Sequence, residues 1–211
     1  MAVARDAALC FIYEANLQTL REMGANVVFF SPLADSQLPR CDAVWLPGGY
    51  PELHAAALSA NHALRDALQA HVAHGKPVWA ECGGMMLLFG ELVDKAGTAH
   101  TMWGLLPGRV VMQKRLAALG PQQLDVPTVS GGSHPALRGH TFHWSLTDTP
   151  LAPVARTQRP GSAAQPVATG VDGEALYAHG PVRASYFHAW FPSAPTAVAA
   201  LLSPQPLEAQ T

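Results

Sequence analysis

Cys82 is the residue whose type and setting most strongly indicate chemistry. It follows the short apolar run Val78-Trp79-Ala80 and precedes Gly83-Gly84 and a helical run from Met85 to Phe89. A strand-to-helix turn of this kind raises its side chain above the carboxyl edge of a parallel sheet, where α/β folds place their ligands. The N-terminus of the following helix favours a thiolate over a thiol. We therefore interpret Cys82 as a nucleophile, although a buried structural cysteine would be the commoner reading of this motif alone.

Two glycine motifs are placed to supply backbone N–H groups beside that thiol. Gly83 follows the nucleophile directly, and Gly48-Gly49 follows the apolar run Val44 to Leu46. In a parallel sheet both loops open at the same edge, so we predict that the Gly49 and Gly83 N–H groups form an oxyanion hole. The alternative for the first motif is an ordinary Pro-Gly-Gly turn.

The residues around Gly49 are candidates for contact with a substrate. Gly48 opens this loop, and Tyr50 and Glu52 extend it. Glu52 is predicted to bind the amino group of a substrate amino acid, since a carboxylate is the natural partner of an ammonium group. The alternative is a solvated glutamate.

His188 is the candidate general base. It follows the apolar run Val182 to Phe187, which we predict to be a strand, and from there it can reach the same edge of the sheet. A nucleophilic cysteine needs a base within about 3 Å of its sulfur in the working geometry. The alternative is a core histidine packed among aromatic neighbours.

The other thiols and imidazoles receive no catalytic role. Cys10 and Cys41 are interpreted as structural cysteines. His140 and His143 lie on a predicted strand at a spacing that does not bring both rings to one face. Together with His134 they lack convergent carboxylates or thiols, so we predict no metal site.

The elements that must position these residues can be predicted from the sequence. The first half of the chain alternates short apolar runs with helical patterns. Continuous apolar strands separated by helices predict an α/β fold with three layers, in which a mostly parallel twisted sheet carries helices on both faces. The predicted strands are Ala2 to Ala4, Val27 to Phe30, Ala43 to Leu46 and Pro77 to Ala80, and the predicted helices are Tyr13 to Met23, the segment after Asn61 that ends at Gly75, and Met85 to Phe89.

The second half is richer in Gly, Pro and Thr and shows few helical patterns. It predicts antiparallel strands at Arg109 to Met112 and His140 to Leu146, a surface loop from Pro150 to Gly170, and a closing helix from Thr196 to Leu202. We expect one domain over residues 1–202 and a disordered tail over residues 203–211.

Composition excludes several classes of function. The net charge is −2 with no run of Lys or Arg, so nothing indicates binding to nucleic acid or to an anionic membrane. No apolar stretch approaches the roughly 20 residues that span a bilayer. Three cysteines without metal-type spacing fit a reducing cytoplasm. Only 13% of the residues are charged, which indicates either a surface covered by a partner or simply an alanine-rich composition.

Four motifs occurring in this order make the sequence recognisable. It resembles the class I glutamine amidotransferase domain of cobyrinate a,c-diamide synthase, including its hydrogenobyrinate-using relatives, over about residues 2 to 195. The motifs are Leu46-Pro47-Gly48-Gly49-Tyr50-Pro51-Glu52-Leu53-His54, Ala80-Glu81-Cys82-Gly83-Gly84-Met85, Leu137-Arg138-Gly139-His140 and Ala184-Ser185-Tyr186-Phe187-His188.

The resemblance implies a flavodoxin-like fold and hydrolysis of glutamine through a γ-glutamyl thioester on Cys82. His188 would act as the base, and Gly49 and Gly83 would hold the oxyanion. It also implies that ammonia passes to a synthetase domain, which uses ATP and Mg²⁺ to amidate the a and c carboxylates of a corrinoid. No phosphate-binding G-x-x-x-x-G-K-[ST] loop occurs in this sequence, so no cofactor is expected in this chain and the synthetase half is expected on a separate domain. A homodimer is left open.

The sequence departs from the family at two positions near the site. Thr141 stands where the family usually has Glu, and Trp190 stands where many class I amidotransferases have a Glu that orients the base. Because an indole cannot accept a hydrogen bond there, another group must orient His188, and His140 and Glu174 are the candidates. The alternatives are the glutaminase of another amidating ligase, such as cobyric acid synthase or the cell-wall amidating type, and a non-catalytic docking module.

Overall fold

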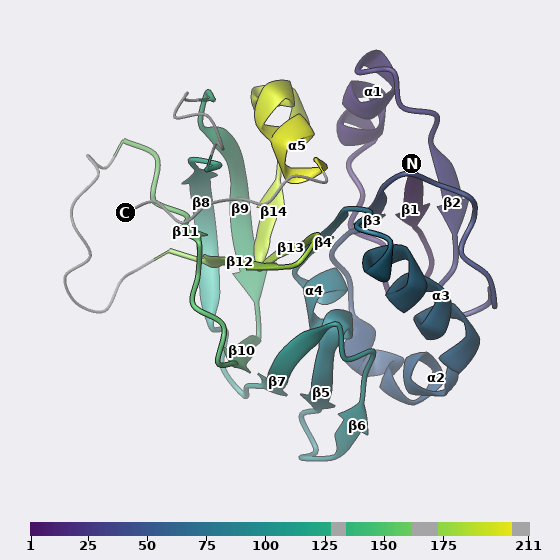
Figure 1. Ribbon diagram of the computed structural model, residues 1–211. Helices are drawn as coiled ribbons and strands as arrows, with labels where there is room; N and C mark the ends of the chain where they lie inside the picture. The colour runs from purple at the N-terminus through teal and green to yellow at the C-terminus, as the bar shows by residue number, and fades with distance from the viewer. Residues whose placement is uncertain (128–133, 162–172, 204–211) are drawn as a thin grey trace.

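A seven-stranded sheet runs through the centre of the protein (Figure 1). The structure is a computed structural model, and it describes residues 1–127, 134–161 and 173–203. Five neighbouring strands pair in parallel. The two strands at one end of the sheet join it through antiparallel pairs, in which each strand runs opposite to its neighbour. In spatial order the strands are β11 (Ala155–Arg156), β12 (Ala175–His179), β13 (Val182–Ser185), β4 (Val78–Glu81), β3 (Val44–Leu46), β1 (Ala2–Ala4) and β2 (Val28–Phe30).

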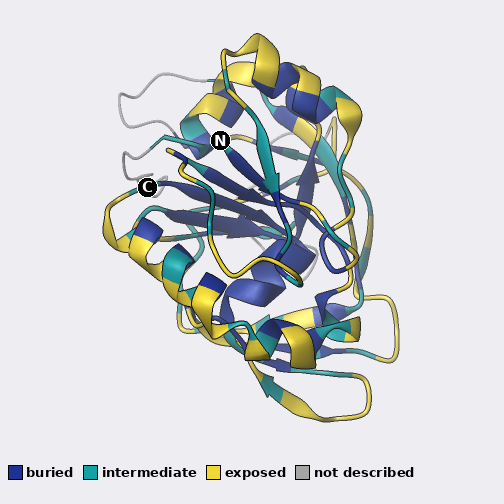
Figure 2. Cartoon of the chain, turned by 90° about the vertical axis from the view of Figure 1, so that its right-hand side faces the viewer, coloured by how far each residue is buried: buried dark blue, intermediate teal, exposed yellow. Residues whose placement is uncertain are grey.

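The central strands are buried on both faces because alternate residues enter two different cores (Figure 2). Val44 and Leu46 of β3 lie in one core, while Trp45 between them lies in the other. Trp79 of β4 joins Trp45 in that second core, and both indoles are fully buried. Continuous apolar strands therefore become the middle layer of a three-layer fold, as predicted.

Helices cover both faces of this sheet (Figure 1). Residues of α2 (Ala55–Ala60), α3 (His62–Ala73) and α4 (Gly83–Leu88) line the first core, and residues of α1 (Glu14–Glu22) and α5 (Pro195–Leu201) line the second. The predicted cap of α3 is confirmed, since the Asn61 side chain accepts a hydrogen bond from Leu64 N at 3.3 Å. Two short 3₁₀ turns, η1 (Pro51–Leu53) and η2 (Phe191–Ser193), complete the helical elements of the described residues.

Two smaller sheets flank the central one. The first has the order β10-β7-β5-β6 and the second has the order β14-β9-β8. Their strands are β5 (Phe89–Val93), β6 (Ala99–Thr101), β7 (Leu106–Met112), β8 (Ala118–Leu124), β9 (Leu137–His143), β10 (Ser145–Asp148) and β14 (Phe187–Ala189). The predicted antiparallel character of the second half is confirmed by the β8, β9, β10, β12 and β14 pairings.

Two predicted strands are each divided in the structure. The segment from His140 to Leu146 is not one strand, because Trp144 separates β9 from β10 and the two strands join different sheets. The strand predicted from Val182 to Phe187 ends at Ser185, and after Tyr186 the chain leaves the central sheet and pairs with β9 as β14. Sequence pattern alone does not mark such a break, because strand-like residues continue across it.

The remaining predictions differ in smaller ways. Phe89 begins β5 rather than ending a helix, and the predicted loop from Pro150 to Gly170 contains β11. Residues 162–172 of that loop and residues 204–211 of the predicted tail lie outside the described residues. No helix in the described part of the chain is long and apolar enough to cross a membrane.

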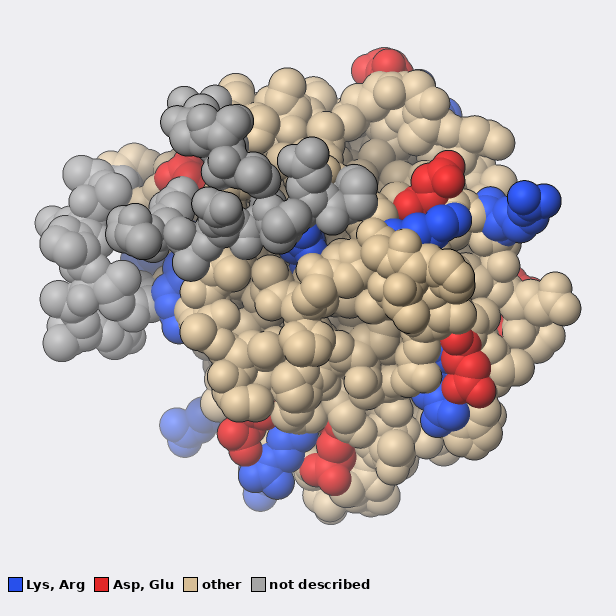
Figure 3. Space-filling model, in the orientation of Figure 1, with Lys and Arg blue, Asp and Glu red and all other residues tan. Residues whose placement is uncertain are grey.

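Charged side chains are sparse on the face shown in Figure 3, where acidic and basic groups are scattered over a mainly uncharged surface. This distribution agrees with the low charge content of the sequence. It offers no contiguous basic surface for a polyanion on that face.

Gly84 is the tightest point of the turn after β4, because a Cβ there would collide with the carbonyl oxygen of Leu46. We expect Gly84→Ala to lower the free energy of unfolding by about 3 kcal/mol, since the neighbouring backbone cannot move aside cheaply. Denaturant unfolding monitored by tryptophan fluorescence measures this loss.

Gly90→Ala is the matched control, because the nearest atom to a new Cβ there, the Gly108 oxygen, would lie at 3.3 Å. Its effect should stay below about 1 kcal/mol. Equal stability of the two variants would show that the turn is not as closely packed as described.

Candidate functional site

Cys82 adopts a strained backbone conformation between β4 and α4. Its φ is 44° and its ψ is −106°, and it is the only non-glycine residue with positive φ in the described residues. Such a conformation costs on the order of 1–3 kcal/mol and persists only where the surroundings impose it. It turns the chain sharply from strand to helix, so that the Cys82 side chain stands at the carboxyl end of β4, as predicted.

Three backbone hydrogen bonds impose this conformation. Cys82 N donates to Ser185 O of β13 at 2.8 Å, and Met86 N donates to Cys82 O at 2.9 Å. Gly84 N donates to Pro47 O at 3.0 Å, which ties the turn to the loop after β3. The turn is therefore fixed from both neighbouring strands.

The two predicted oxyanion-hole residues lie side by side. A Cβ on Gly83 would lie 2.8 Å from Gly49 N, so the two backbones are in direct contact. The Gly83 N–H hydrogen-bonds to the Cys82 sulfur and lowers the pKa of the thiol. A Cβ on Gly49 would collide with Ala8 O, so only glycine fits there. Both N–H groups are thus next to the thiol, where an oxyanion would form.

A small pocket of about 30 Å³ opens onto the thiol. This volume holds only about one or two water molecules, so a glutamine side chain requires it to widen. Of the predicted substrate contacts, Tyr50 and Glu52 line the pocket, whereas Gly48 packs against the His188 ring instead. The lining residues are Phe11, Gly49, Tyr50, Glu52, Cys82, Met86, Met112, Phe142, His143, Trp144 and Ser145.

His188 lies on β14, outside that lining. Its side chain is buried, with its ring stacked on His140 at 4.8 Å between centroids and packed against Gly48. Its Nε2 has no hydrogen-bond partner among the described residues. The Cys82 sulfur faces the carbonyl oxygen of Phe142 at 3.8 Å, and no hydrogen bond in the described part of the chain joins it to His188.

Burial keeps both reacting groups neutral. It raises the pKa of the Cys82 thiol well above its usual value, and the negative charges of Glu52, Glu81 and Glu174 raise it further against the Gly83 hydrogen bond. Burial also lowers the pKa of His188 to about 3, with smaller contributions from His140 and His143. The structure therefore represents a thiol and an imidazole rather than an ion pair.

Glu52 carries a partly buried carboxyl at the pocket. Burial raises its pKa, an effect that its own backbone N–H and the charges of Lys95 and His54 oppose. A carboxylate in this position gains most from a cationic partner, because burial has removed part of its hydration.

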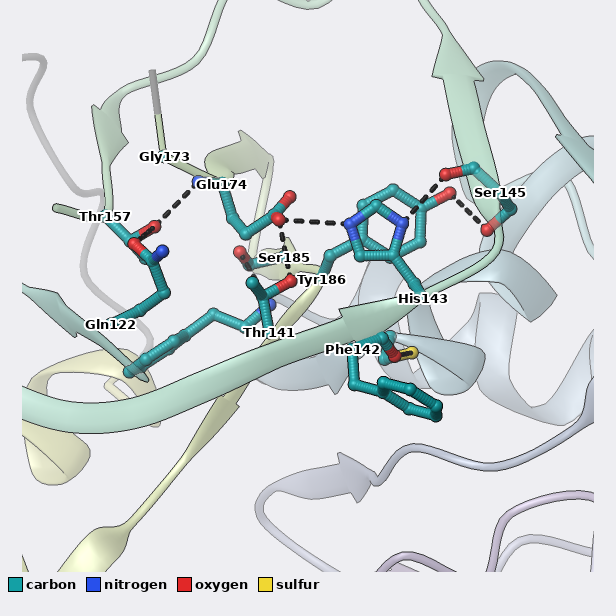
Figure 4. A network of polar contacts seen from close by, with 12 residues as sticks. Gln122, Thr141, Phe142, His143, Ser145, Thr157, Gly173, Glu174, Ser185 and Tyr186 are labelled. Atoms are coloured by element: carbon teal, nitrogen blue, oxygen red, sulfur yellow. Dashed lines mark hydrogen bonds and ion pairs between the residues drawn. The ribbon is translucent and has the colours of Figure 1, made fainter. Parts of the chain in front are cut away.

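A polar network forms another wall of the pocket (Figure 4). His143 Nε2 lies 3.0 Å from Glu174 Oε1, and His143 Nδ1 lies 2.8 Å from Ser145 O. Thr141 Oγ1 donates to the same Glu174 oxygen at 2.6 Å. The His143 ring also stacks on Tyr186 at 3.7 Å between centroids. These contacts fix the segment whose Phe142 carbonyl faces the thiol.

His143 is not placed to act as the base, although it lines the pocket. Each of its ring nitrogens contacts an oxygen, Nδ1 that of Ser145 O and Nε2 that of Glu174 Oε1, so neither is directed at the thiol. Burial would raise the pKa of Glu174, but the hydrogen bond and charge of His143 and the Thr141 hydroxyl outweigh burial and lower it. Glu174 therefore binds His143, not His188, and the suggestion that it orients His188 is wrong.

Comparison with known proteins assigns this chain to a family. Residues 1–196 match the model of the CobB/CobQ-like glutamine amidotransferase domain. The chain belongs to this family. The predicted class of enzyme domain, a glutamine amidotransferase, is thereby confirmed.

Curated relatives agree with this assignment. The chain is 47% identical over 204 residues to hydrogenobyrinate a,c-diamide synthase of Stutzerimonas stutzeri, covering 97% of this chain and 44% of that protein. It is 46% identical over 206 residues to cobyrinate a,c-diamide synthase of Herminiimonas arsenicoxydans, covering 97% and 44%. The chain thus spans less than half the length of these relatives.

Solved structures show the same fold at low sequence identity. A glutamine amidotransferase aligns with a TM-score of 0.54 at 20% identity, covering 89% of both chains. PurLQS from Thermotoga maritima aligns with a TM-score of 0.54 at 15% identity, covering 89% of this chain and 74% of the other. These likenesses confirm the predicted α/β fold.

Sequence reasoning missed the network of His143, Thr141 and Glu174. The spacing of His140 and His143 indicated rings on opposite faces. In the structure the His140 ring stacks on the His188 ring, whereas His143 lines the pocket. Nothing in the sequence marked Glu174 as a partner of His143, because the pair joins β9 to a residue far along the chain. In the described residues no three His, Cys, Asp or Glu side chains converge as metal ligands would.

Glu174→Gln should lower stability at neutral pH, because it removes the carboxylate that binds His143. The folded-state pKa of Glu174 lies below its usual value, so its contribution is complete above about pH 4.3, the unfolded-state pKa, and is lost as pH falls through the folded-state pKa. The difference in Tm between the protein and this variant should therefore be largest at pH 7 and should shrink below about pH 4.

Glu91→Gln on β5 serves as the control and should show no such pH-dependent difference. A Tm difference for Glu174→Gln that is the same at pH 7 and in acid would contradict a stabilising His143–Glu174 ion pair.

Proposed function

We propose that this chain hydrolyses glutamine, with Cys82 as nucleophile and His188 as general base. The observation that carries the proposal is the strained turn at Cys82, which places a thiol beside the Gly49 and Gly83 N–H groups and at a pocket. Strained backbone conformations of non-glycine residues cluster at active sites, so strain at Cys82 is typical of a reacting group. Membership of the glutamine amidotransferase family supplies the substrate class.

In the proposed reaction the Cys82 sulfur attacks the side-chain amide carbon of glutamine. His188 takes the thiol proton, and the Gly49 and Gly83 N–H groups stabilise the tetrahedral oxyanion. The C–N bond then breaks, His188 returns the proton to the departing nitrogen, and ammonia leaves a γ-glutamyl thioester. Water, deprotonated by His188, hydrolyses the thioester to glutamate and regenerates the thiol.

This reaction requires a rearrangement of the structure described here. The thiol donates toward Phe142 O at 3.8 Å, and His188 Nε2 has no partner in the described part of the chain. The sulfur must turn from Phe142 toward the imidazole before a proton can pass. Binding of the substrate ammonium to Glu52 favours this step, because it neutralises one of the charges that raise the pKa of the thiol.

The ammonia is proposed to serve a synthetase domain outside this chain. Two relatives are named as a,c-diamide synthases of cobyrinate or hydrogenobyrinate, and the chain covers 44% of the length of each. We therefore propose that the substrates of the whole protein are glutamine and the a and c carboxylates of a corrinoid. ATP and Mg²⁺ would act on the synthetase domain, and the cytoplasm would be the compartment.

A non-catalytic docking module is the second candidate, because no hydrogen bond joins the Cys82 thiol to the His188 imidazole in the described part of the chain. A glutamine-mimicking diazoketone separates the two functions. A single adduct on Cys82, found by intact mass and peptide mapping, supports glutaminase chemistry. If neither the chain nor the full-length protein that carries it is labelled, the docking module is favoured.

Cys82→Ser should abolish glutamine hydrolysis and diazoketone labelling while leaving Tm nearly unchanged, because a serine hydroxyl lacks the thiol's nucleophilicity at this site. We expect a loss of more than about 10³-fold in kcat. Release of glutamate and circular dichroism provide the two measurements.

Cys10→Ser, at an exposed position, and Cys41→Ser, at a buried one, are the matched controls and should retain turnover. Substantial hydrolysis by Cys82→Ser, or its loss in a folded Cys41→Ser protein, would move the nucleophile elsewhere.

Glu52→Gln should raise KM for glutamine by about 10- to 100-fold, since it removes the anionic partner of the substrate ammonium. Alkylation of Cys82 by neutral iodoacetamide should become faster or stay unchanged, because the lost charge had raised the pKa of the thiol. Initial rates over a range of glutamine concentrations and alkylation rates measure both effects.

The same substitution at Glu91 should leave KM and alkylation as they are. If Glu52→Gln left KM unchanged, the glutamate would be a surface residue rather than a substrate ligand.

A further inference from the structure

A buried carboxyl lies directly beside the nucleophile and has no part in the proposed reaction. Glu81 is the last residue of β4, and its side chain is 2% exposed. It shares the Trp79 face of β4, where Trp79 Nε1 donates to Glu81 Oε1 at 2.7 Å. It therefore points into the second core, beneath α1 and β14, and away from the pocket. A buried carboxyl is costly, so its partners indicate what it does.

Apart from Trp79, the nearest polar neighbours of this carboxyl among the described residues are further hydrogen-bond donors. The backbone N–H of Ala189 and the Trp45 indole N–H both point toward it, in each case without a hydrogen bond of full geometry. Burial raises the pKa of Glu81 to about 8 against these donors. The titratable groups that face it are Tyr13, whose pKa it raises, and Cys82. Ionisation of Glu81 strengthens its contacts with these donors, because a carboxylate is a stronger acceptor than a neutral carboxyl.

Asn16 of α1 holds the same residue of β14 from its other side. Its side chain is fully buried, and Asn16 Nδ2 donates to Ala189 O at 2.8 Å. Asn16 Oδ1 accepts from Phe191 N at 2.9 Å. Ala189 therefore lies between two buried side chains, with its carbonyl bound by Asn16 of α1 and its N–H directed at Glu81 of β4.

Ala189 directly follows His188, whose ring is oriented by no hydrogen bond from the residues that the structure describes. The imidazole is held by stacking on His140 and by packing against Gly48. Because its nitrogen Nε2 has no partner within the described residues, the position of the ring depends on where the β14 backbone lies. On the other edge, β14 is tied to β9 by the hydrogen bond from Trp190 N to Arg138 O at 2.7 Å.

We propose that Glu81 and Asn16 are positioning residues that fix His188 relative to Cys82 by holding Ala189 from two sides. Glu81 is covalently adjacent to the nucleophile, so it couples the turn that carries the thiol to the strand that carries the base. The side chain that orients the base in many relatives of this fold would bind the imidazole itself, whereas here the backbone beside it is bound. This inference rests on the proposed function.

Glu81→Gln tests the inference in the full-length protein that carries this chain. The glutamine amide must present an N–H₂ group to the donors that now surround the carboxylate, so β14 should shift. We expect kcat for glutamine hydrolysis to fall by about 10- to 100-fold, with little change in KM, because substrate contacts are untouched. The ratio of wild-type to variant kcat should rise with pH through about 8, since protonation of Glu81 weakens the same contact in the wild type.

Asn16→Asp should have the same effect on kcat, because it removes the donor to Ala189 O. Thr19→Val is the matched control on α1. It removes a different buried hydrogen-bond donor, the Thr19 hydroxyl that donates to Ala15 O, without touching β14. It should change Tm and leave kcat unaltered. A Glu81→Gln kcat ratio near one, or a ratio that does not change with pH, would overturn the proposal.

Amide hydrogen exchange separates failure of this inference from failure of the proposed function. Absence of hydrolysis in the wild type would refute the proposed function. The exchange rate at Ala189 would still show whether Glu81 and Asn16 hold β14 in place. We expect that rate to increase at least about 10-fold in Glu81→Gln. Unchanged exchange at Ala189 would show that Glu81 does not hold the strand, whatever the turnover.

Discussion

The strained backbone of Cys82 is the constraint on which the rest of the site depends. A residue with φ of 44° holds its position only because β13, β3 and the first turn of α4 each bind its surroundings. Those bonds require close approach of backbones, which explains why Gly49, Gly83 and Gly84 have no room for a Cβ. The positions of the thiol, of the Gly49 and Gly83 N–H groups and of the pocket are therefore consequences of one turn, and a change to any of its supports alters all three.

The electrostatics of the site describe a resting enzyme. A buried thiol with a raised pKa and a buried imidazole with a pKa of about 3 do not exchange a proton spontaneously. The surrounding carboxylates oppose thiolate formation, while the His143–Glu174 pair is locked by its own hydrogen bonds. Such an arrangement keeps the thiol protonated, and a neutral thiol is less easily oxidised than a thiolate.

The sequence predicted the fold and the turn at Cys82 well because both depend on local patterns. Apolar runs between helical segments define the parallel sheet, and a cysteine before two glycines at a strand end defines the turn. The position of His188 was less predictable, since the strand that carries it breaks at Tyr186 and changes sheets. The partners of Glu81, Asn16 and His143 could not be predicted, because they are side chains brought together only by tertiary packing.

The order of strands also has a consequence for synthesis of the chain. β4 pairs with β13, yet β13 begins at Val182 and β4 ends at Glu81. A ribosome adds about 5–20 residues per second, so for several seconds the Val78-Trp79-Ala80 edge has no neighbour on that side. An apolar, unpaired edge strand is a template for aggregation. Chains released early by truncation would keep that edge exposed, and they would also lack His188. Prompt degradation of incomplete chains is therefore expected to matter more for this protein than for one whose central strands are consecutive.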